Sequence, residues 1–304
     1  MPNMAFREIT SIVRLHIVLI AMAAAVVFGW LFGGKYLWTV ALLGGLDWLL
    51  INLLNRITDT QEDVANEIDG AGHVARFKSL WLVCWCVLQA GSIAFGFWLW
   101  PALLTYRLSV QLIGVAYSYR IVPTLKGWRR LKDLYFLKNF MSSMLFVLTV
   151  FIYPLAALGF QVRLQGQWAA AGLLAAFFVT FEITYEILYD MRDLEGDRLA
   201  GVPTYPVVHG LHRSRQIVDA LLLGSVTFIL IGLVTGTLGV REALFVVAPA
   251  LQFVFYRPRY HRGLTSPDCI LLTHLGTAML VVFLIGASLW LRVGLPENIF
   301  LVGG

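Results

Sequence analysis

The sequence contains little charge. Only 13% of its 304 residues are Asp, Glu, Lys or Arg, about half the fraction in an ordinary soluble domain. Hydrophobic residues make up 59% of the chain, and the mean hydropathy is +0.77. These values exclude a typical soluble protein and predict an integral membrane protein. The 23 Lys and Arg against 18 Asp and Glu then indicate loops that face anionic lipid, and we expect no nucleic-acid partner.

Cysteine is also scarce. Cys84, Cys86 and Cys269 all fall within apolar runs, and their number and spacing fit neither a disulfide framework nor a structural zinc site. A short apolar segment with a small-residue cleavage site is missing as well, so we expect no removable signal peptide. The first apolar run is long enough to cross a membrane.

Long apolar segments separated by polar clusters fill the sequence. They predict about nine transmembrane helices in one all-α bundle, near residues 9–33, 36–57, 79–100, 102–119, 134–158, 168–190, 216–239, 242–256 and 269–291. The segment 242–256 is the shortest of them. No low-complexity linker divides the chain, so residues 1–304 are expected to form a single transmembrane domain with a polar cap on one side.

Basic residues are concentrated in every second connection between the predicted helices. The connections 58–78, 120–133, 191–215 and 257–268 hold fourteen Lys and Arg, whereas the others hold only Lys35, Arg163 and Arg241. The positive-inside rule therefore places the N-terminus and the four basic connections in the cytoplasm. We expect a multi-pass protein of the cell inner membrane with its polar cap on the cytoplasmic face.

The second apolar segment ends in a cluster of oxygen-bearing side chains, NRITDTQED. Asn55, Asp59 and Asp63 recur every four residues, so a continuous helix would place them along one stripe, about 6 Å apart along the axis. Acidic groups at a helix C-terminus oppose the helix dipole, which makes a purely stabilising role a poor explanation. The stripe predicts a cation site, with solvated loop charges as the alternative.

A second acidic cluster ends the sixth segment. Glu182, Glu186, Asp190, Asp193 and Asp197 occur in FEITYEILYDMRDLEGD at intervals that keep them on one side of a continuous helix. Both clusters leave the membrane on the same predicted face, so helix packing can bring them together. Two carboxylate clusters suit Mg²⁺, which commonly bridges carboxylates to substrate phosphates.

Lysine and arginine residues lie between the two acidic clusters in the sequence. The stretch YSYRIVPTLKGWRRLKDLYFLKNF supplies Arg120, Lys126, Arg129, Arg130, Lys132 and Lys138. On its own this stretch is an ordinary basic loop, but beside two acidic clusters it predicts a diphosphate-binding site. Asp47, alone within the second segment, is equally consistent with a hydrogen-bonded packing carboxylate and with a site residue.

These motifs together resemble the UbiA superfamily of intramembrane prenyltransferases. Asn55, Asp59 and Asp63 match its NxxxDxxxD motif, and Asp190, Asp193 and Asp197 match its DxxDxxxD motif. Nine helices, with motifs after the second and sixth, also fit, so the resemblance covers nearly the whole chain. In two places the chain departs from the pattern. An Arg-Pro-Ile-x-Ser-Gly-like run after the first motif is absent, and Tyr189 stands where relatives often have Asn.

The resemblance implies a Mg²⁺-dependent transfer of an isoprenyl group from an isoprenyl diphosphate to a lipophilic acceptor, for which an aromatic molecule is one candidate. Magnesium would be bound by both motifs, namely Asn55, Asp59, Asp63, Asp190, Asp193 and Asp197. Arg120, Lys132 and Lys138, with Asn55, would bind the diphosphate. Tyr117 would face the carbocation, because an aromatic face attracts a desolvated cation, and membrane lipid would surround the prenyl chain.

Two other functions remain open at this point. A membrane terpene cyclase would form the same carbocation and quench it on the substrate's own double bonds, and the missing run after the first motif keeps this alternative. A cation-coupled transporter would also bind an ion through membrane carboxylates, but it predicts acidic groups near the bilayer midplane and paired broken helices.

Overall fold

The computed structural model describes residues 6–302, and the predicted side of the N-terminus itself lies outside these residues. Helices dominate the fold, and the connection after α7 contains a two-stranded antiparallel hairpin. The helices are α1 (Phe6–Ile12), α2 (Leu15–Gly33), α3 (Trp38–Thr58), α4 (Thr60–Ala65), α5 (Ala71–Arg76), α6 (Lys78–Leu99), α7 (Leu104–Ser118), α8 (Leu137–Val147), α9 (Tyr153–Ala157), α10 (Gln167–Arg192), α11 (Leu194–Ala200), α12 (Tyr205–Val234), α13 (Val240–Ala243), α14 (Val247–Tyr260) and α15 (Ser266–Arg292). The hairpin strands are β1 (Val122–Thr124) and β2 (Gly127–Arg129), and the short helical turns are η1 (Pro101–Leu103), η2 (Leu131–Asp133), η3 (Leu148–Ile152) and η4 (Leu244–Val246).

Seven helical segments within residues 6–302 are long and apolar enough to cross a membrane. They are α2, α3, α6, α10, α12, α15 and the continuous run from α8 through η3 to α9. Two of the nine predicted spans are shorter helices, α7 with 15 residues and α14 with 14 residues. The prediction of an all-α, multi-pass membrane protein is confirmed.

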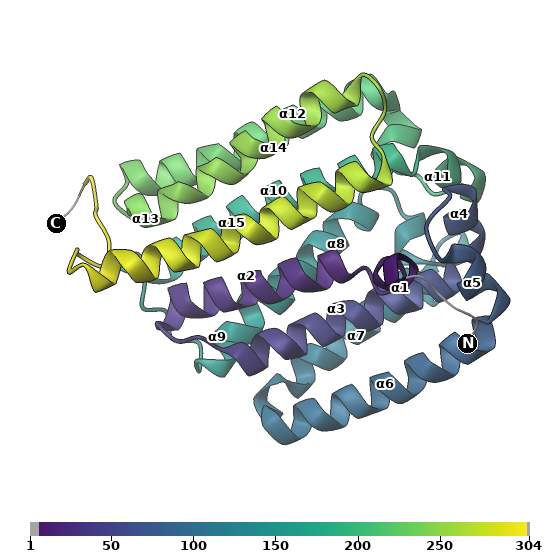
Figure 1. Cartoon of the computed structure of the whole chain (residues 1–304), viewed down its shortest axis with the longest axis horizontal. Helices are drawn as coiled ribbons and strands as arrows, with labels where there is room; N and C mark the ends of the chain where they lie inside the picture. Colours follow the sequence, from purple (N-terminus) through teal and green to yellow (C-terminus); the bar gives the residue numbers. More distant parts are fainter. Residues whose placement is uncertain (1–5, 303–304) are drawn as a thin grey trace.

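The long helices lie side by side as one bundle (Figure 1). The short helices α4, α5 and α11 gather at one end of this bundle and form its polar cap, whereas α9, α13 and the described C-terminal residues lie at the other end. The cap is built from connections predicted to be basic and cytoplasmic.

Small residues bring the helices of the bundle into close contact. A Cβ atom at Gly45 of α3 would lie 2.5 Å from Met22 of α2, and one at Gly114 of α7 would lie 2.7 Å from Ile51 of α3. Such positions let helix backbones approach closely in a membrane, where dispersion contacts rather than water exclusion drive packing. The central helix α3 is therefore fixed between α2 and α7.

Asp47 is a packing carboxylate. It is fully buried in α3, and its two oxygens accept hydrogen bonds from Arg107 at 2.8 and 2.9 Å, from Tyr153 at 2.9 Å and from Gln111 at 2.9 Å. Arg107 also donates to the Ser92 carbonyl oxygen at 2.7 Å. One ion pair thus connects α3 to α6, α7 and α9, and of the two interpretations of Asp47 the structure supports the structural one.

We expect Arg107→Met to destabilise the bundle, because removing one partner leaves a buried carboxylate without compensation, at a cost of about 3–5 kcal/mol. Thermal unfolding of the purified protein in detergent measures this. Arg7→Met is the matched control, since Arg7 pairs with Asp69 at an exposed site, where such a pair contributes less than about 1 kcal/mol. Equal melting temperatures for both variants would contradict the assignment.

Candidate active site

Both acidic motifs have the same local architecture, a long helix that breaks at the middle residue of the motif. Helix α3 ends at Thr58 and α4 begins at Thr60, with Asp59 between them at φ −97° and ψ 24°. Helix α10 ends at Arg192 and α11 begins at Leu194, with Asp193 between them at φ −92° and ψ 13°. The expectation of continuous helices was therefore wrong, because a spacing of four also fits a helix, a bend and a short second helix.

The two motifs meet through α4 and α11. The Gly196 backbone N–H of α11 donates to Asn66 Oδ1, just after α4, at 3.0 Å. A Cβ atom at position 196 would lie only 2.3 Å from the Asn66 side chain. A larger residue at position 196 would therefore displace the Asn66 side chain. Neither residue was identified from the sequence, because the contact depends on how the two short helices dock.

Each aspartate of the first motif is paired with a cation. Lys132 Nζ lies 2.7 Å from Asp59 and 2.6 Å from Glu62, and Arg56 Nη1 lies 2.6 Å from Asp63 Oδ1. All of these side chains are mostly buried. Buried carboxylates need such partners, because water cannot solvate them.

The second motif is paired in the same way. Lys138 Nζ lies 2.5 Å from Asp190 and 3.4 Å from Asp197, and Asn139 donates to the other Asp190 oxygen at 2.9 Å. Arg192 binds Asp193 through a two-pronged ion pair. Lys132 and Lys138 were predicted here, whereas Arg56 and Arg192 were missed, although each lies within or next to a motif in the sequence.

A polar cavity of about 120 Å³ lies between these residues. Nine of the ten predicted site residues line it, namely Asn55, Asp59, Asp63, Tyr117, Lys132, Lys138, Asp190, Asp193 and Asp197. Arg120 does not line the cavity, because the chain leaves α7 at Ser118 and enters the β1–β2 hairpin with Arg120 exposed. The hairpin returns the chain toward the cavity, where Arg130 Nη1 lies 3.5 Å from Asp59.

Two carboxyl groups of the second motif, Asp193 and Asp197, have pKa values shifted in opposite directions. Burial raises the pKa of Asp197 to about 6; nearby Asp190 and Asp193 add to this effect and the charge of Lys138 opposes it. Burial would also raise the pKa of Asp193, but the charge and hydrogen bonds of Arg192 outweigh it and hold the pKa below its usual value. The charge of Asp193 is thus compensated by a two-pronged pair with Arg192, whereas among residues 6–302 Asp197 has only the Lys138 contact at 3.4 Å.

The oxygen donors fit a hard divalent cation. Asn55 Oδ1 and Asp63 Oδ2 are buried without a hydrogen-bond partner, and both residues line the cavity. Oxygen atoms of amides and carboxylates are the ligands that Mg²⁺ prefers. Among residues 6–302, no three His, Cys, Asp or Glu side chains could hold a metal ion as they stand.

Tyr189 does not replace the oxygen donor that its position often supplies in relatives. Its hydroxyl shares a hydrogen bond with Thr273 at 2.9 Å and donates to the Cys269 carbonyl oxygen at 3.2 Å. The Arg192 guanidinium lies 4.7 Å from the centre of its ring. Tyr189 therefore connects α10 to α15 and supports the arginine that holds Asp193.

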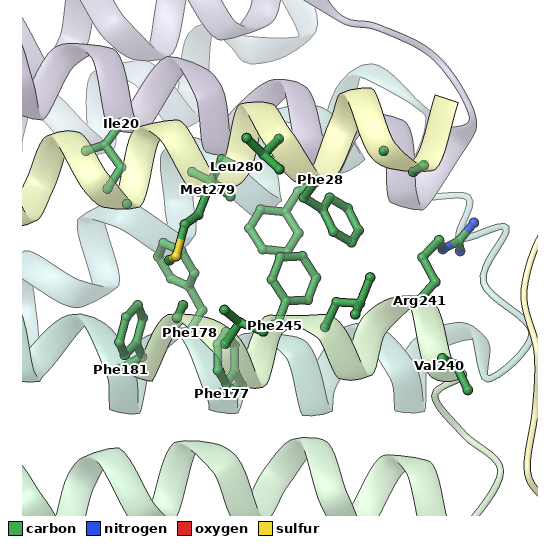
Figure 2. Close-up of a pocket in the computed structure, with 18 of the residues that line it drawn as sticks. Ile20, Phe28, Phe177, Phe178, Phe181, Val240, Arg241, Phe245, Met279 and Leu280 are labelled. Atoms are coloured by element: carbon green, nitrogen blue, oxygen red, sulfur yellow. The ribbon is translucent and has the colours of Figure 1, made fainter. Parts of the chain in front are cut away.

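An apolar cavity of about 390 Å³ adjoins the polar one. Four residues line both cavities, namely Ile20, Phe146, Glu182 and Tyr185. Beyond them the walls are mostly aromatic and aliphatic side chains of α2, α10, α13, η4, α14 and α15 (Figure 2). The site can thus bind a molecule with an anionic head and a hydrocarbon tail.

Comparison with known proteins gives one family and one fold. A sequence model of the UbiA prenyltransferase family matches residues 15–273. The chain is similar to a UbiA homolog from Archaeoglobus fulgidus, solved with DMAPP and Mg²⁺ and with GPP and Mg²⁺, at 15% identity and a TM-score of 0.65 over 92% of this chain and 98% of that one. It is similar to an apo UbiA homolog from Aeropyrum pernix K1 at 14% identity and a TM-score of 0.61 over 91% and 98% of the two chains. None of the curated proteins matched.

We expect Gly196→Ala to weaken binding of magnesium and inorganic diphosphate by about tenfold or more, because the added methyl group overlaps Asn66 and separates the motifs. The measurement is the rise in melting temperature as both ligands are titrated into the purified protein. Gly72→Ala in α5 is the control, since a Cβ atom there meets nothing within 4 Å. An unchanged titration for Gly196→Ala would show that the contact with Asn66 does not hold the two motifs together for ligand binding.

Proposed function

The chain belongs to the UbiA prenyltransferase family and is an intramembrane prenyltransferase, and we propose that it transfers an isoprenyl group from an isoprenyl diphosphate to a lipophilic acceptor in a Mg²⁺-dependent reaction. An aromatic molecule is the acceptor class to test first. The observation that carries this proposal is the junction of a polar cavity, lined by paired aspartates and lysines, with an apolar cavity inside the membrane bundle. The related structures solved with DMAPP or GPP and Mg²⁺ support it.

The metal ligands of the proposal are Asn55, Asp59, Asp63, Asp190, Asp193 and Asp197. Their support is the pair of unsatisfied buried oxygens, on Asn55 and Asp63, and the fact that all six residues line the same polar cavity. A magnesium ion held by these residues would supply positive charge to the diphosphate leaving group. We place this site on the cytoplasmic face, on the basis of the basic connections.

Lys132 and Lys138 bind the diphosphate in this proposal. Lys138 lies against Asp190 and Asp197, which are both proposed metal ligands, and Lys132 lies against the proposed ligand Asp59 and against Glu62. A lysine released from its carboxylates can donate hydrogen bonds to phosphate oxygens and stabilise the leaving group. Arg120 is exposed and has no role in this proposed diphosphate site. Arg130, which contacts Asp59, is the third basic residue of the site instead.

Tyr117 and the apolar walls protect the carbocation. Tyr117 lines the polar cavity, and an aromatic face attracts a desolvated cation by about 2 kcal/mol. Phe146 and Ile20, at the junction of the two cavities, keep water from the allylic carbon. Diphosphate leaves first, with both electrons of the C–O bond, and the acceptor then forms its bond to the allylic carbon and loses a proton, which the released diphosphate can accept.

Diphosphate release from geranyl, farnesyl and geranylgeranyl diphosphates tests the proposal. The purified protein is assayed in detergent with Mg²⁺, with and without a panel of aromatic acceptors. The masses of the lipid products are determined by mass spectrometry. Acceptor-dependent release with a product equal to acceptor plus prenyl group supports transfer. Release without acceptor that gives a cyclic hydrocarbon or alcohol would make the protein a terpene cyclase, and uptake of an unchanged solute would make it a transporter.

We expect Asp63→Asn and Asp193→Asn each to lower the rate of diphosphate release by about 10²-fold or more, because each removes a charge that would bind the metal. The substitutions preserve shape, so melting temperatures report whether the fold survives. Asp69→Asn is the control, since Asp69 is exposed and paired with Arg7. Wild-type turnover in both site variants would exclude the two motifs from the reaction.

A further inference from the structure

The apolar cavity lies between α15 on one side and α13, η4 and α14 on the other, with α10 and α2 behind (Figure 2). Aromatic rings of Phe28, Phe178 and Phe245 point into it, and Arg241 lies at one end. Val247 of α14 and Val282 of α15 line the cavity and are also exposed on the outside of the bundle. A hydrocarbon chain can therefore enter sideways from lipid, without threading from the polar end.

The length of this cavity follows from the helix that forms its wall. Its lining residues on α15 run from Gly276, beside Tyr185, to Trp290, a distance of about 21 Å at 1.5 Å per residue. An extended isoprene unit adds four carbons to the chain and advances about 5 Å, since each C–C bond is about 1.5 Å. The cavity is therefore about four isoprene units long.

The far end of the cavity is lined by the segment Glu297–Ile299, beside Arg241. Asn298 Oδ1 accepts hydrogen bonds from the Arg241 backbone N–H at 3.0 Å and from the Ile299 N–H at 2.9 Å, and Asn298 Nδ2 donates to Glu242 Oε2 at 2.5 Å. The Val240 N–H donates to the Ile299 carbonyl oxygen at 2.8 Å. The Asn298 side chain and this backbone bond together hold residues 297–299, the tail of the chain, against α13.

We propose that this cavity holds the hydrocarbon chain of the donor and that the tail held by Asn298 limits that chain to about four isoprene units. The inference rests on the proposed function and adds the donor class, a diphosphate of about twenty carbons. Each unit up to the fourth exchanges lipid for the aromatic walls around Phe178 and Phe245. A fifth unit meets Asn298 and Arg241 or remains outside the cavity, so it adds no contact.

Gly286 offers a way to shorten the cavity without disturbing the fold. It lines the cavity in α15, and a Cβ atom there would meet nothing within 4 Å. It lies ten residues beyond Gly276, about 15 Å at the helical rise, near the level of the third or fourth isoprene unit. A leucine at this position fills that space and also favours the helix over glycine.

The experiment measures binding across donor lengths. Diphosphates with chains of 5 to 30 carbons compete with labelled geranyl diphosphate for the full-length protein in nanodiscs with Mg²⁺. Each variant is compared with wild type at every length, which cancels the partitioning of long donors into lipid. We expect Gly286→Leu to lower the affinity for the 20-carbon donor relative to the 10-carbon donor by about tenfold. Gly91→Leu, in the lipid-facing helix α6 with equally open space around its Cβ, keeps the wild-type ratio.

A second variant tests the far end of the cavity, which is lined by residues 297–299. Asn298→Ala releases the tail and is expected to raise the affinity for 25- and 30-carbon donors relative to the 20-carbon donor by about threefold or more. An unchanged ratio in Gly286→Leu would show that the cavity does not hold the chain. A lowered ratio there, with no gain for long donors in Asn298→Ala, would show that the tail does not set the limit.

Failure of the inference and failure of the proposed function give different results. If donors of several lengths bind and release diphosphate but neither variant changes the length profile, the prenyltransferase proposal stands and the length limit is overturned. If no isoprenyl diphosphate of any length binds with Mg²⁺, both are overturned.

Discussion

The structure depends on the pairing of charges that have been removed from water. Two aspartate motifs sit at the ends of membrane helices, where an unpaired carboxylate costs several kcal/mol. Arg56, Lys132, Lys138 and Arg192 each lie against one or more of these carboxylates. The aspartates are therefore stable within the fold before any ligand arrives, and a divalent cation would replace one positive partner with another.

This pairing explains why lysine suits the positions that change partners. A flexible ammonium group can move from a carboxylate to a phosphate, whereas a two-pronged arginine pair is more rigid. Lys132 and Lys138 contact two carboxylates each, while Arg192 is fixed on Asp193 and covered by Tyr189. The site thus combines charges that can move with charges that hold one aspartate in place.

The two motifs, and the prediction that they come together in space, could be derived from the sequence. The path of the chain around them could not. Apolar segments of membrane length and a four-residue spacing are local patterns, and they located α3, α10 and the aspartates correctly. The bend at Asp59, the contact between Asn66 and Gly196, and the exposure of Arg120 depend on docking and on the β1–β2 hairpin, for which no local pattern exists. Asp47 remained ambiguous for the same reason, since its partners come from α7 and α9, about sixty and one hundred residues away.

Helix α10 shows how one element can order both parts of an amphipathic substrate. Asp190 lines the polar cavity near its end, Glu182 and Tyr185 line both cavities, and Phe177 lines the apolar one. The thirteen helical steps from Phe177 to Asp190 span about 20 Å along a nearly rigid helix. Because a helix holds these spacings fixed, a head group bound at Asp190 would place the first carbons of its tail beside Glu182 and Tyr185. The length of the tail would then be measured against the far end of the cavity and not against the site of bond breaking.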